Sequence, residues 1–185
     1  MGLAEAALRS SWPGPRCEFR DGRRVLKTLL IVWESRTGGA EQMARAAAVP
    51  DPDVTVRLVR APDATAGDLL AADGYIFATP ENLAAMAGPM KDFFDRTYYP
   101  VLDRLNGRPY ATLICAGSDG ENTARQIARI ATGWRLRRVA APLIVRVGAQ
   151  TPEAILAPKT IGEADLGRCA EIGATLAAGL AAGIF

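Results

Sequence analysis

Two hydroxyl side chains and two glycines stand together at residues 35–40, which read Ser-Arg-Thr-Gly-Gly-Ala. They follow a short apolar run, Lys27 to Trp33, and precede a segment rich in Ala, Glu and Gln. At such a strand-to-helix junction, free backbone N–H groups and the helix dipole attract a phosphate. The loop has neither the Lys of a Walker P-loop nor the G-x-G-x-x-G spacing of a dinucleotide site. A phosphomonoester is therefore the expected ligand, with an ordinary capped turn as the alternative.

Two further polar loops follow apolar segments. Residues 79–82 read Thr-Pro-Glu-Asn, and residues 117–122 read Gly-Ser-Asp-Gly-Glu-Asn. Ligands of open parallel sheets lie beyond the carboxyl ends of the strands. We therefore expect these two loops and residues 35–40 to meet at one site.

The segments between the loops alternate between strand and helix patterns. Short apolar runs are typical of strands buried on both faces of a parallel sheet, whereas apolar residues three and four apart indicate helices. Such an alternation predicts an α/β fold with right-handed crossovers. We expect strands at 27–33, 54–59, 74–78, 110–116 and 143–147, and helices at 40–49, 63–72, 85–98, 121–134 and 165–184.

The composition excludes several classes of protein. The 185 residues include no His, which excludes a Ser-His-Asp or Cys-His hydrolase. A formal net charge of +2 gives no basic field for nucleic acid. The three widely spaced cysteines suggest neither a disulfide framework nor a zinc site, which favours the cytoplasm. The longest apolar stretch, residues 172–185, is shorter than the ~20 residues of a membrane span, so we expect none.

Residues 1–24 depart from the α/β pattern. They are rich in Arg, Gly and Pro and hold five Arg against three acidic residues, whereas residues 25–185 hold 17 basic and 17 acidic residues. We expect a mobile N-terminal extension followed by one domain over residues 25–185. The alternative is an arm that packs Trp12 on its own or a neighbouring subunit.

The three loops together resemble the flavodoxin-like FMN-binding family, especially its NAD(P)H-dependent FMN reductase and quinone reductase branch. The similarity rests on the strings S-R-T-G-G, T-P-E-N, G-P-M-K-D-F-F-D-R and A-G-S-D-G, and it covers about residues 27–183. It implies a three-layer αβα sandwich around a five-stranded parallel sheet of order 2-1-3-4-5. FMN would lie where the strand order reverses.

The resemblance also implies which residues bind FMN. By this similarity Ser35, Arg36, Thr37, Gly38, Gly39 and Ala40 would hold the phosphate, Thr79, Pro80, Glu81 and Asn82 would border the isoalloxazine ring, and Gly117, Ser118 and Asp119 would line its other edge. The family often has a second Thr where this chain has Ala40, so one hydroxyl donor is absent.

Glu81 and Asn82 occupy the place where relatives often present an aromatic side chain that stacks on the flavin. Without that side chain, one face of the ring is open to a nicotinamide or a quinone. Beside the ring, the charge of Glu81 would oppose reduction of the flavin. The alternatives for Glu81 are a solvated carboxylate and a charge at a helix N-terminus.

The resemblance implies an FMN-dependent oxidoreductase that takes hydride from NADH or NADPH. It would pass two electrons to a quinone or a similar small acceptor, with no catalytic side chain and no metal. One alternative is a flavodoxin-type electron carrier, although the balanced charge lacks the acidic surface that such a carrier uses for docking. The other is a non-redox scaffold that has lost FMN.

Three further features have structural interpretations. Met86 and Met90 are expected in the core, and Cys115 is expected to be an inert buried thiol. Arg135, Arg137 and Arg138 are more typical of a solvated helix end than of a site for nicotinamide-dinucleotide phosphates. Glycines at close intervals in the last helix favour tight packing of this helix on the sheet, with a homo-oligomer interface as the alternative.

Overall fold

The computed structural model describes residues 19–20, 23–24 and 26–185. The predicted mobile extension, residues 1–24 with Trp12, lies outside the described residues except for residues 19–20 and 23–24. In it, β1 (Phe19–Arg20) lies antiparallel to β2 (Arg23–Arg24).

A parallel sheet forms the centre of the molecule, and the predicted order 2-1-3-4-5 is confirmed. In spatial order its strands are β4 (Val54–Arg60), β3 (Lys27–Trp33), β5 (Gly74–Asn82), β7 (Pro109–Ala116) and β9 (Leu143–Arg146). The chain runs from β3 to β4 on one side and returns to β5 on the other, so the strand order reverses between β3 and β5.

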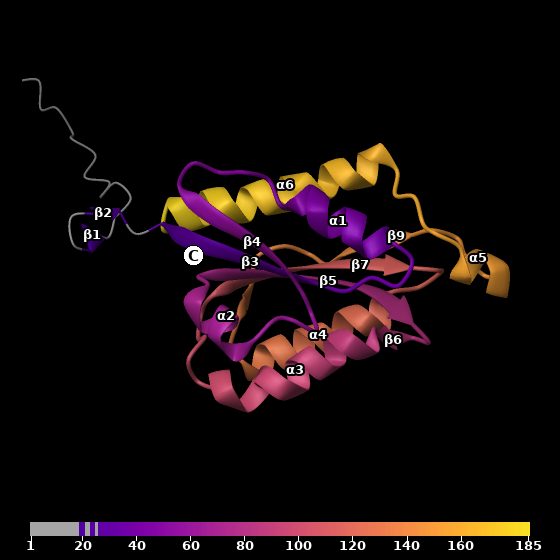
Figure 1. Ribbon diagram of the computed structural model, residues 1–185, viewed down its shortest axis with the longest axis horizontal. Helices are drawn as coiled ribbons and strands as arrows, with labels where there is room; N and C mark the ends of the chain where they lie inside the picture. The colour runs from indigo at the N-terminus through magenta and orange to yellow at the C-terminus, as the bar shows by residue number, and fades with distance from the viewer. Residues whose placement is uncertain (1–18, 21–22, 25) are drawn as a thin grey trace, which may run out of the picture.

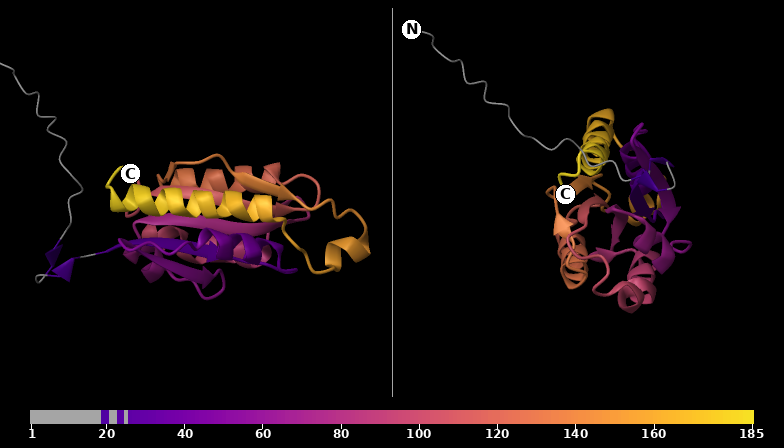
Figure 2. Two further views of the ribbon diagram at one scale, coloured as in Figure 1. Left: turned by 90° about the horizontal axis from the view of Figure 1, so that it is seen from above. Right: turned by 90° about the vertical axis from the view of Figure 1, so that its left-hand side faces the viewer.

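Helices cover both faces of the sheet (Figure 1). One face carries α1 (Gly39–Ala47) and α6 (Glu163–Ala181), and the other carries α2 (Ala66–Ala71), α3 (Gly88–Val101) and α4 (Glu121–Gly133). The short helix α5 (Pro152–Leu156) projects beyond the end of the sheet (Figure 2). These layers are the three-layer αβα sandwich that the sequence predicted.

The central position of β3 explains why residues 29–33 are all apolar. Its successive side chains point to opposite faces, so Leu29 and Ile31 join the core under α1 and α6, while Leu30 and Val32 join the core under α2, α3 and α4. All four are fully buried. Met86 and Met90 also lie in the second core, as predicted.

The structure corrects the boundaries around the second loop. The predicted helix 85–98 begins only at Gly88, because residues 85–86 form the strand β6 (Ala85–Met86) antiparallel to the end of β5. Leu83 and Ala84 make the two-residue turn with φ of 51° and 58°, the left-handed pattern of a type I′ hairpin. The predicted strand 74–78 therefore extends to Asn82. The short elements α5 and β8 (Arg137–Arg138) were not predicted.

Helices α1 and α6 approach each other at Gly173. A Cβ atom on this residue would lie 1.9 Å from the carbonyl oxygen of Ala47. Only glycine allows this approach. The close packing expected of the last helix on the sheet is, at Gly173, packing against the neighbouring helix α1.

Asp68 is expected to stabilise the protein in a pH-dependent way. Its carboxylate accepts hydrogen bonds from the N–H of Thr65 (2.9 Å) and from Arg57 (2.6 Å), and with Thr65 it forms the capping box of α2. Burial alone would raise the pKa of Asp68, but these hydrogen bonds outweigh it and the pKa lies below its usual 3.8. Replacing Asp68 with Asn should cost about 0.5 to 2 kcal/mol at neutral pH.

The pH dependence of this cost has a definite sign. Because the pKa of Asp68 is lowered by folding, its stabilisation is complete above the usual pKa and is lost as the pH falls through the folded value. Urea unfolding of the native protein and Asp68→Asn at pH 7 and near pH 3 measures the effect. The control is Asp63→Asn, which removes an exposed carboxylate from the segment before α2. A difference that persists unchanged at acidic pH contradicts this role.

Candidate flavin-binding site

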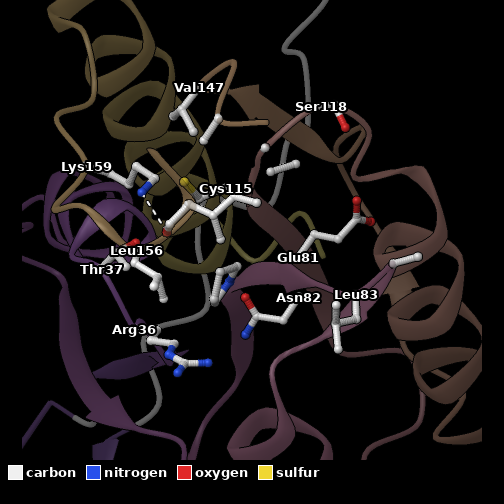
Figure 3. A pocket seen from close by; sticks show the side chains of 16 residues that line it. Arg36, Thr37, Glu81, Asn82, Leu83, Cys115, Ser118, Val147, Leu156 and Lys159 are labelled. Carbon is white, nitrogen blue, oxygen red and sulfur yellow. Dashed lines mark hydrogen bonds between the residues drawn. The ribbon is translucent and has the colours of Figure 1, made fainter. Parts of the chain in front are cut away.

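The three predicted loops meet at the carboxyl ends of β3, β5 and β7. Parallel pairing places Trp33 beside Ala78, and Pro80 beside Cys115, so the loops that follow start at one edge of the sheet. Between them lies a pocket of about 380 Å³, within the usual range for small-molecule sites. It is lined by Arg36, Thr37, Pro80, Glu81, Asn82, Leu83, Ala84, Cys115, Ala116, Gly117, Ser118, Val147, Ala149, Ile155, Leu156 and Lys159 (Figure 3).

The first loop ends in a sharp turn at the start of α1. Gly38 is the N-cap residue with φ of 86°, and its N–H donates to Ser35 Oγ at 3.0 Å. The N–H groups of the first helical turn, from Gly39 on, have no intrahelical acceptor. Within the described chain, the side chains of Arg36 and Thr37 have no hydrogen-bond or ion-pair partner. Arg36 and Thr37 thus bring donors for a phosphate to this side of the pocket, and the free N–H groups of α1 follow them directly in the chain.

Glu34 lies directly before this loop and was not predicted. Its buried carboxylate accepts from the N–H of Ser35 at 3.0 Å and from the guanidinium of Arg60 at 2.9 Å. The Arg60 guanidinium also lies over the ring of Trp33. Glu34 therefore fixes the start of the loop while Arg60 compensates its charge.

The pocket includes seven of the thirteen predicted side chains or glycines, namely Arg36, Thr37, Pro80, Glu81, Asn82, Gly117 and Ser118. Ser35, Gly38, Gly39, Ala40, Thr79 and Asp119 do not line it. Ala40 is buried in the core under α1 and α6, so only its backbone N–H could serve a phosphate. Thr79 is also buried, and its hydroxyl accepts from the N–H of Ala87 at 3.2 Å, which closes the second loop.

Glu81 binds the start of α4. Its Oε1 accepts from the N–H of Gly120 at 2.8 Å, and its Oε2 accepts from the Thr123 hydroxyl at 3.1 Å. Gly120 is the N-cap residue of α4 and has no side chain of its own to cap it. The interpretation of Glu81 as a charge at a helix N-terminus is thus confirmed.

Residues 149–161 form one wall of the pocket that the sequence did not predict. Ile155 and Leu156 of α5 expose apolar side chains there, and Lys159 follows them. The backbone N–H of Lys159 donates to the carbonyl of Thr37 at 2.7 Å, which joins this wall to the first loop. No residue pattern predicts such a wall. It is a connecting segment whose position depends on backbone hydrogen bonds to residues far away in the sequence.

Cys115 lies at the base of the pocket, under the first loop. Burial raises the pKa of its thiol, and the positive charge of Lys159 opposes this rise only in part. The thiol is therefore protonated at neutral pH, as expected for an inert cysteine. A Cβ on Gly39 would lie 2.5 Å from its sulfur, so glycine is needed where α1 begins.

The basic cluster lies away from the pocket. Arg137 and Arg138 pair with the amino end of β7, whereas the pocket lies beyond its carboxyl end. The Arg137 guanidinium lies 5.3 Å from the ring centroid of Phe185, and Arg135 pairs with Asp103. The geometry therefore does not favour a phosphate site. The interpretation as a helix end fits Arg135, which follows the C-cap of α4, but is wrong for Arg137 and Arg138, which form the strand β8.

No helix in the described part of the chain is both long and apolar enough to cross a membrane. Within the same residues, no group of three or more His, Cys, Asp or Glu side chains could hold a metal ion.

Residues 40–148 match the family described as NADPH-dependent FMN reductase. The chain belongs to this family. Members are FMN-binding flavoproteins with a flavodoxin-like fold, so the resemblance to this family is confirmed. The match begins at Ala40, in the first turn of α1, and so leaves out residues 35–39 of the first loop. It ends at Gly148, before the wall formed by residues 149–161.

Other proteins of the flavodoxin group are similar to this FMN reductase family member. A flavodoxin of Aquifex aeolicus is 33% identical over 93 residues, which span 49% of this chain and about half, 48%, of the relative. A solved archaeal flavodoxin has 19% identity and a TM-score of 0.68, covering 83% of this chain and 98% of its own. A WrbA-like protein from Agrobacterium tumefaciens has 21% identity and a TM-score of 0.60, covering 83% and 97%. The two solved structures show the fold alone.

The residues present fit FMN. The pocket has the donor side chains of Arg36, Thr37 and Lys159 on the side of the first loop, which suits a phosphate, and residues of the second and third loops on the other side, which suits a ring. Arg36 and Thr37 would hold the phosphate, while Asn82, Gly117 and Ser118 would border the ring.

Proposed function

We propose that this protein is an FMN-dependent oxidoreductase that accepts hydride from NADH or NADPH and passes two electrons to a quinone or a similar small acceptor. FMN supplies the redox chemistry when it is bound. The side chains of this chain bind and orient the flavin and leave room for a second flat molecule. No acid or base from the protein is needed.

The observation that carries this proposal is the absence of aromatic side chains around the pocket. None of the sixteen lining residues, all of them in the described chain, is Phe, Tyr or Trp. No protein ring can therefore stack on a flavin there. A nicotinamide and a quinone both react from within contact distance of the flavin face, so an open face favours an enzyme over a carrier.

The rim of the pocket favours an apolar acceptor. Leu83 stands fully exposed at the tip of the β5–β6 hairpin, and Leu156 lies on the opposite side of the pocket (Figure 3). Leu156 and its neighbour in α5, Ile155, are both exposed and both line the pocket. Exposed apolar side chains on both sides of a pocket are typical of ligand-binding surfaces. They would contact the ring of a quinone.

The test is an anaerobic titration. The purified protein is saturated with FMN, mixed with NADPH or NADH without oxygen, and then given a water-soluble benzoquinone. The proposal predicts rapid bleaching of the flavin absorbance by one of the nucleotides and its return with the quinone. FMN that stays bound but unbleached indicates an electron carrier, and absence of binding indicates a scaffold.

An electron carrier is the second candidate, because the Aquifex aeolicus relative is named a flavodoxin. Carriers of this kind dock through charge complementarity, and the association depends strongly on salt. The same titration separates the two functions, since a carrier needs a separate reductase before NADPH can reduce it.

Replacing Thr37 with Val should weaken FMN binding by about 1 to 3 kcal/mol, because hydrogen bonds to a charged phosphate are strong. The Kd should rise roughly five- to 150-fold. Quenching of flavin fluorescence measures it. Thr55→Val, an exposed Thr on the edge strand β4, is the control and should bind FMN as the native protein does. An unchanged Kd for Thr37→Val would place the phosphate elsewhere.

A further inference from the structure

The two sides of the pocket carry different charges. Arg36 and Lys159 lie on the side of the first loop, and neither forms an ion pair within the described residues (Figure 3). The pocket's carboxylate, Glu81, lies on the other side, where the N-terminus of α4 compensates it. The uncompensated positive charge is thus concentrated where α1 begins. An anionic group is favoured at that end alone.

The backbone of Lys159 is fixed against the first loop by several hydrogen bonds. Its N–H donates to the carbonyl of Thr37, and its carbonyl accepts from Gln42 Nε2 at 2.6 Å. The other atom of the same amide, Gln42 Oε1, accepts from the N–H of Ile161 at 3.1 Å. Gln42 belongs to α1, so the helix itself holds Lys159 beside the phosphate loop.

The ammonium group of Lys159 has only neutral partners. It donates to the carbonyls of Ala154, Ile155 and Ala157 at 2.7, 3.0 and 2.5 Å. Carbonyl oxygens satisfy its N–H groups but leave the full positive charge in place. Lys159 is half-buried, and its ammonium lies on the wall of the pocket without a counter-ion. An anionic ligand that pairs with such a group gains more binding free energy than one that pairs with an exposed charge.

We propose that Lys159 is a binding residue for the FMN phosphate and supplies a second positive charge beside that of Arg36. The proposal rests on the proposed function, because it takes FMN as the ligand. It accounts for Ala40, since a cation from residues 149–161 replaces the hydroxyl that is absent from α1. It also gives the wall beyond the family match a role in cofactor binding.

The experiment compares FMN with riboflavin, which has the same ring and ribityl chain but no phosphate. The Kd of each ligand is measured for the native protein, Lys159→Gln and Lys159→Arg at low ionic strength. Gln can still donate to the carbonyls of α5, so it removes the charge and keeps a tie to that helix. Lys91→Gln removes the same charge from the exposed face of α3 and is the control.

We expect Lys159→Gln to raise the Kd for FMN about tenfold and to leave that for riboflavin unchanged. Lys159→Arg should keep most of the FMN affinity, and Lys91→Gln should alter neither ligand. Equal weakening of both ligands would overturn the proposal, because Lys159 would then act only by holding α5. An unchanged Kd for FMN would overturn it as well. If the native protein binds FMN but neither nucleotide reduces it, the proposed function fails while the assignment of Lys159 stands.

Discussion

Replacing Gly173 with Ala is expected to lower the free energy of unfolding by about 3 kcal/mol, the upper part of the range for overpacked sites. The added methyl group would lie 1.9 Å from the Ala47 carbonyl oxygen. That oxygen belongs to the backbone of α1 and cannot rotate away, so the two helices must separate. The gain of up to ~1 kcal/mol from replacing Gly by Ala within a helix offsets only part of this cost.

Gly167→Ala is the matched control for this prediction. Gly167 lies in the same helix, α6, with nothing within 4 Å of its added Cβ, so the substitution should be neutral or slightly stabilising. Urea unfolding of both variants measures the difference. FMN affinity should fall for Gly173→Ala, because α1 carries the phosphate loop at its start. Equal stability of the two variants would contradict this prediction, because it would show that α1 and α6 can accommodate a methyl group at Gly173.

The fold could be predicted because each main strand is a short apolar run and each long helix has a regular apolar face. Strand β3 illustrates this. Because both of its faces are buried, its residues do not alternate between polar and apolar, but the short apolar run itself indicates a strand. Errors arose where local backbone geometry decides. Nothing in the residue types of Leu83 and Ala84 signals two left-handed residues. The end of β5 was therefore predicted as a loop, and β6 as the start of a helix. Gly88-Pro89 marks the true start of α3.

The candidate site was predictable to the extent that its residues follow strands. The loops after β3, β5 and β7 reach the pocket because parallel strands end at one edge. Lys159 could not be found this way, because it follows no strand directly. Hydrogen bonds of its backbone with Thr37 and Gln42 hold it beside the pocket. Glu34 was missed because an acidic residue before a phosphate loop has no obvious role until its pairing with Arg60 is known.

Replacing Glu81 with Leu is expected to cost about 2 to 3 kcal/mol of folding stability, because hydrogen bonds to a charged group are lost and the N–H of Gly120 loses its acceptor. Glu81→Gln keeps one oxygen for that N–H and loses only the charge at the N-terminus of α4. The loss of stability in Glu81→Gln should therefore be smaller. The missing charge at the helix N-terminus costs about 0.3 to 1 kcal/mol, and the neutral hydrogen bond that remains is weaker than the charged one. Urea unfolding at neutral pH orders the native protein, Glu81→Gln and Glu81→Leu.

Glu121→Gln is the control variant for Glu81. It shows whether stability depends on the hydrogen bonds of Glu81 or on any negative charge near the N-terminus of α4. Glu121 lies in the first turn of α4, but its carboxylate is largely exposed and pairs with Arg146, so its loss should cost no more than about 1 kcal/mol. Because the positive end of α4 compensates Glu81, Glu81→Gln should shift the potential of bound FMN only slightly. A carboxylate free beside the ring would behave differently: Glu81→Gln would raise the potential clearly, most of all at low salt, and would leave stability unchanged. Redox titration and urea unfolding of the same variant therefore decide whether Glu81 acts on the helix or on the flavin.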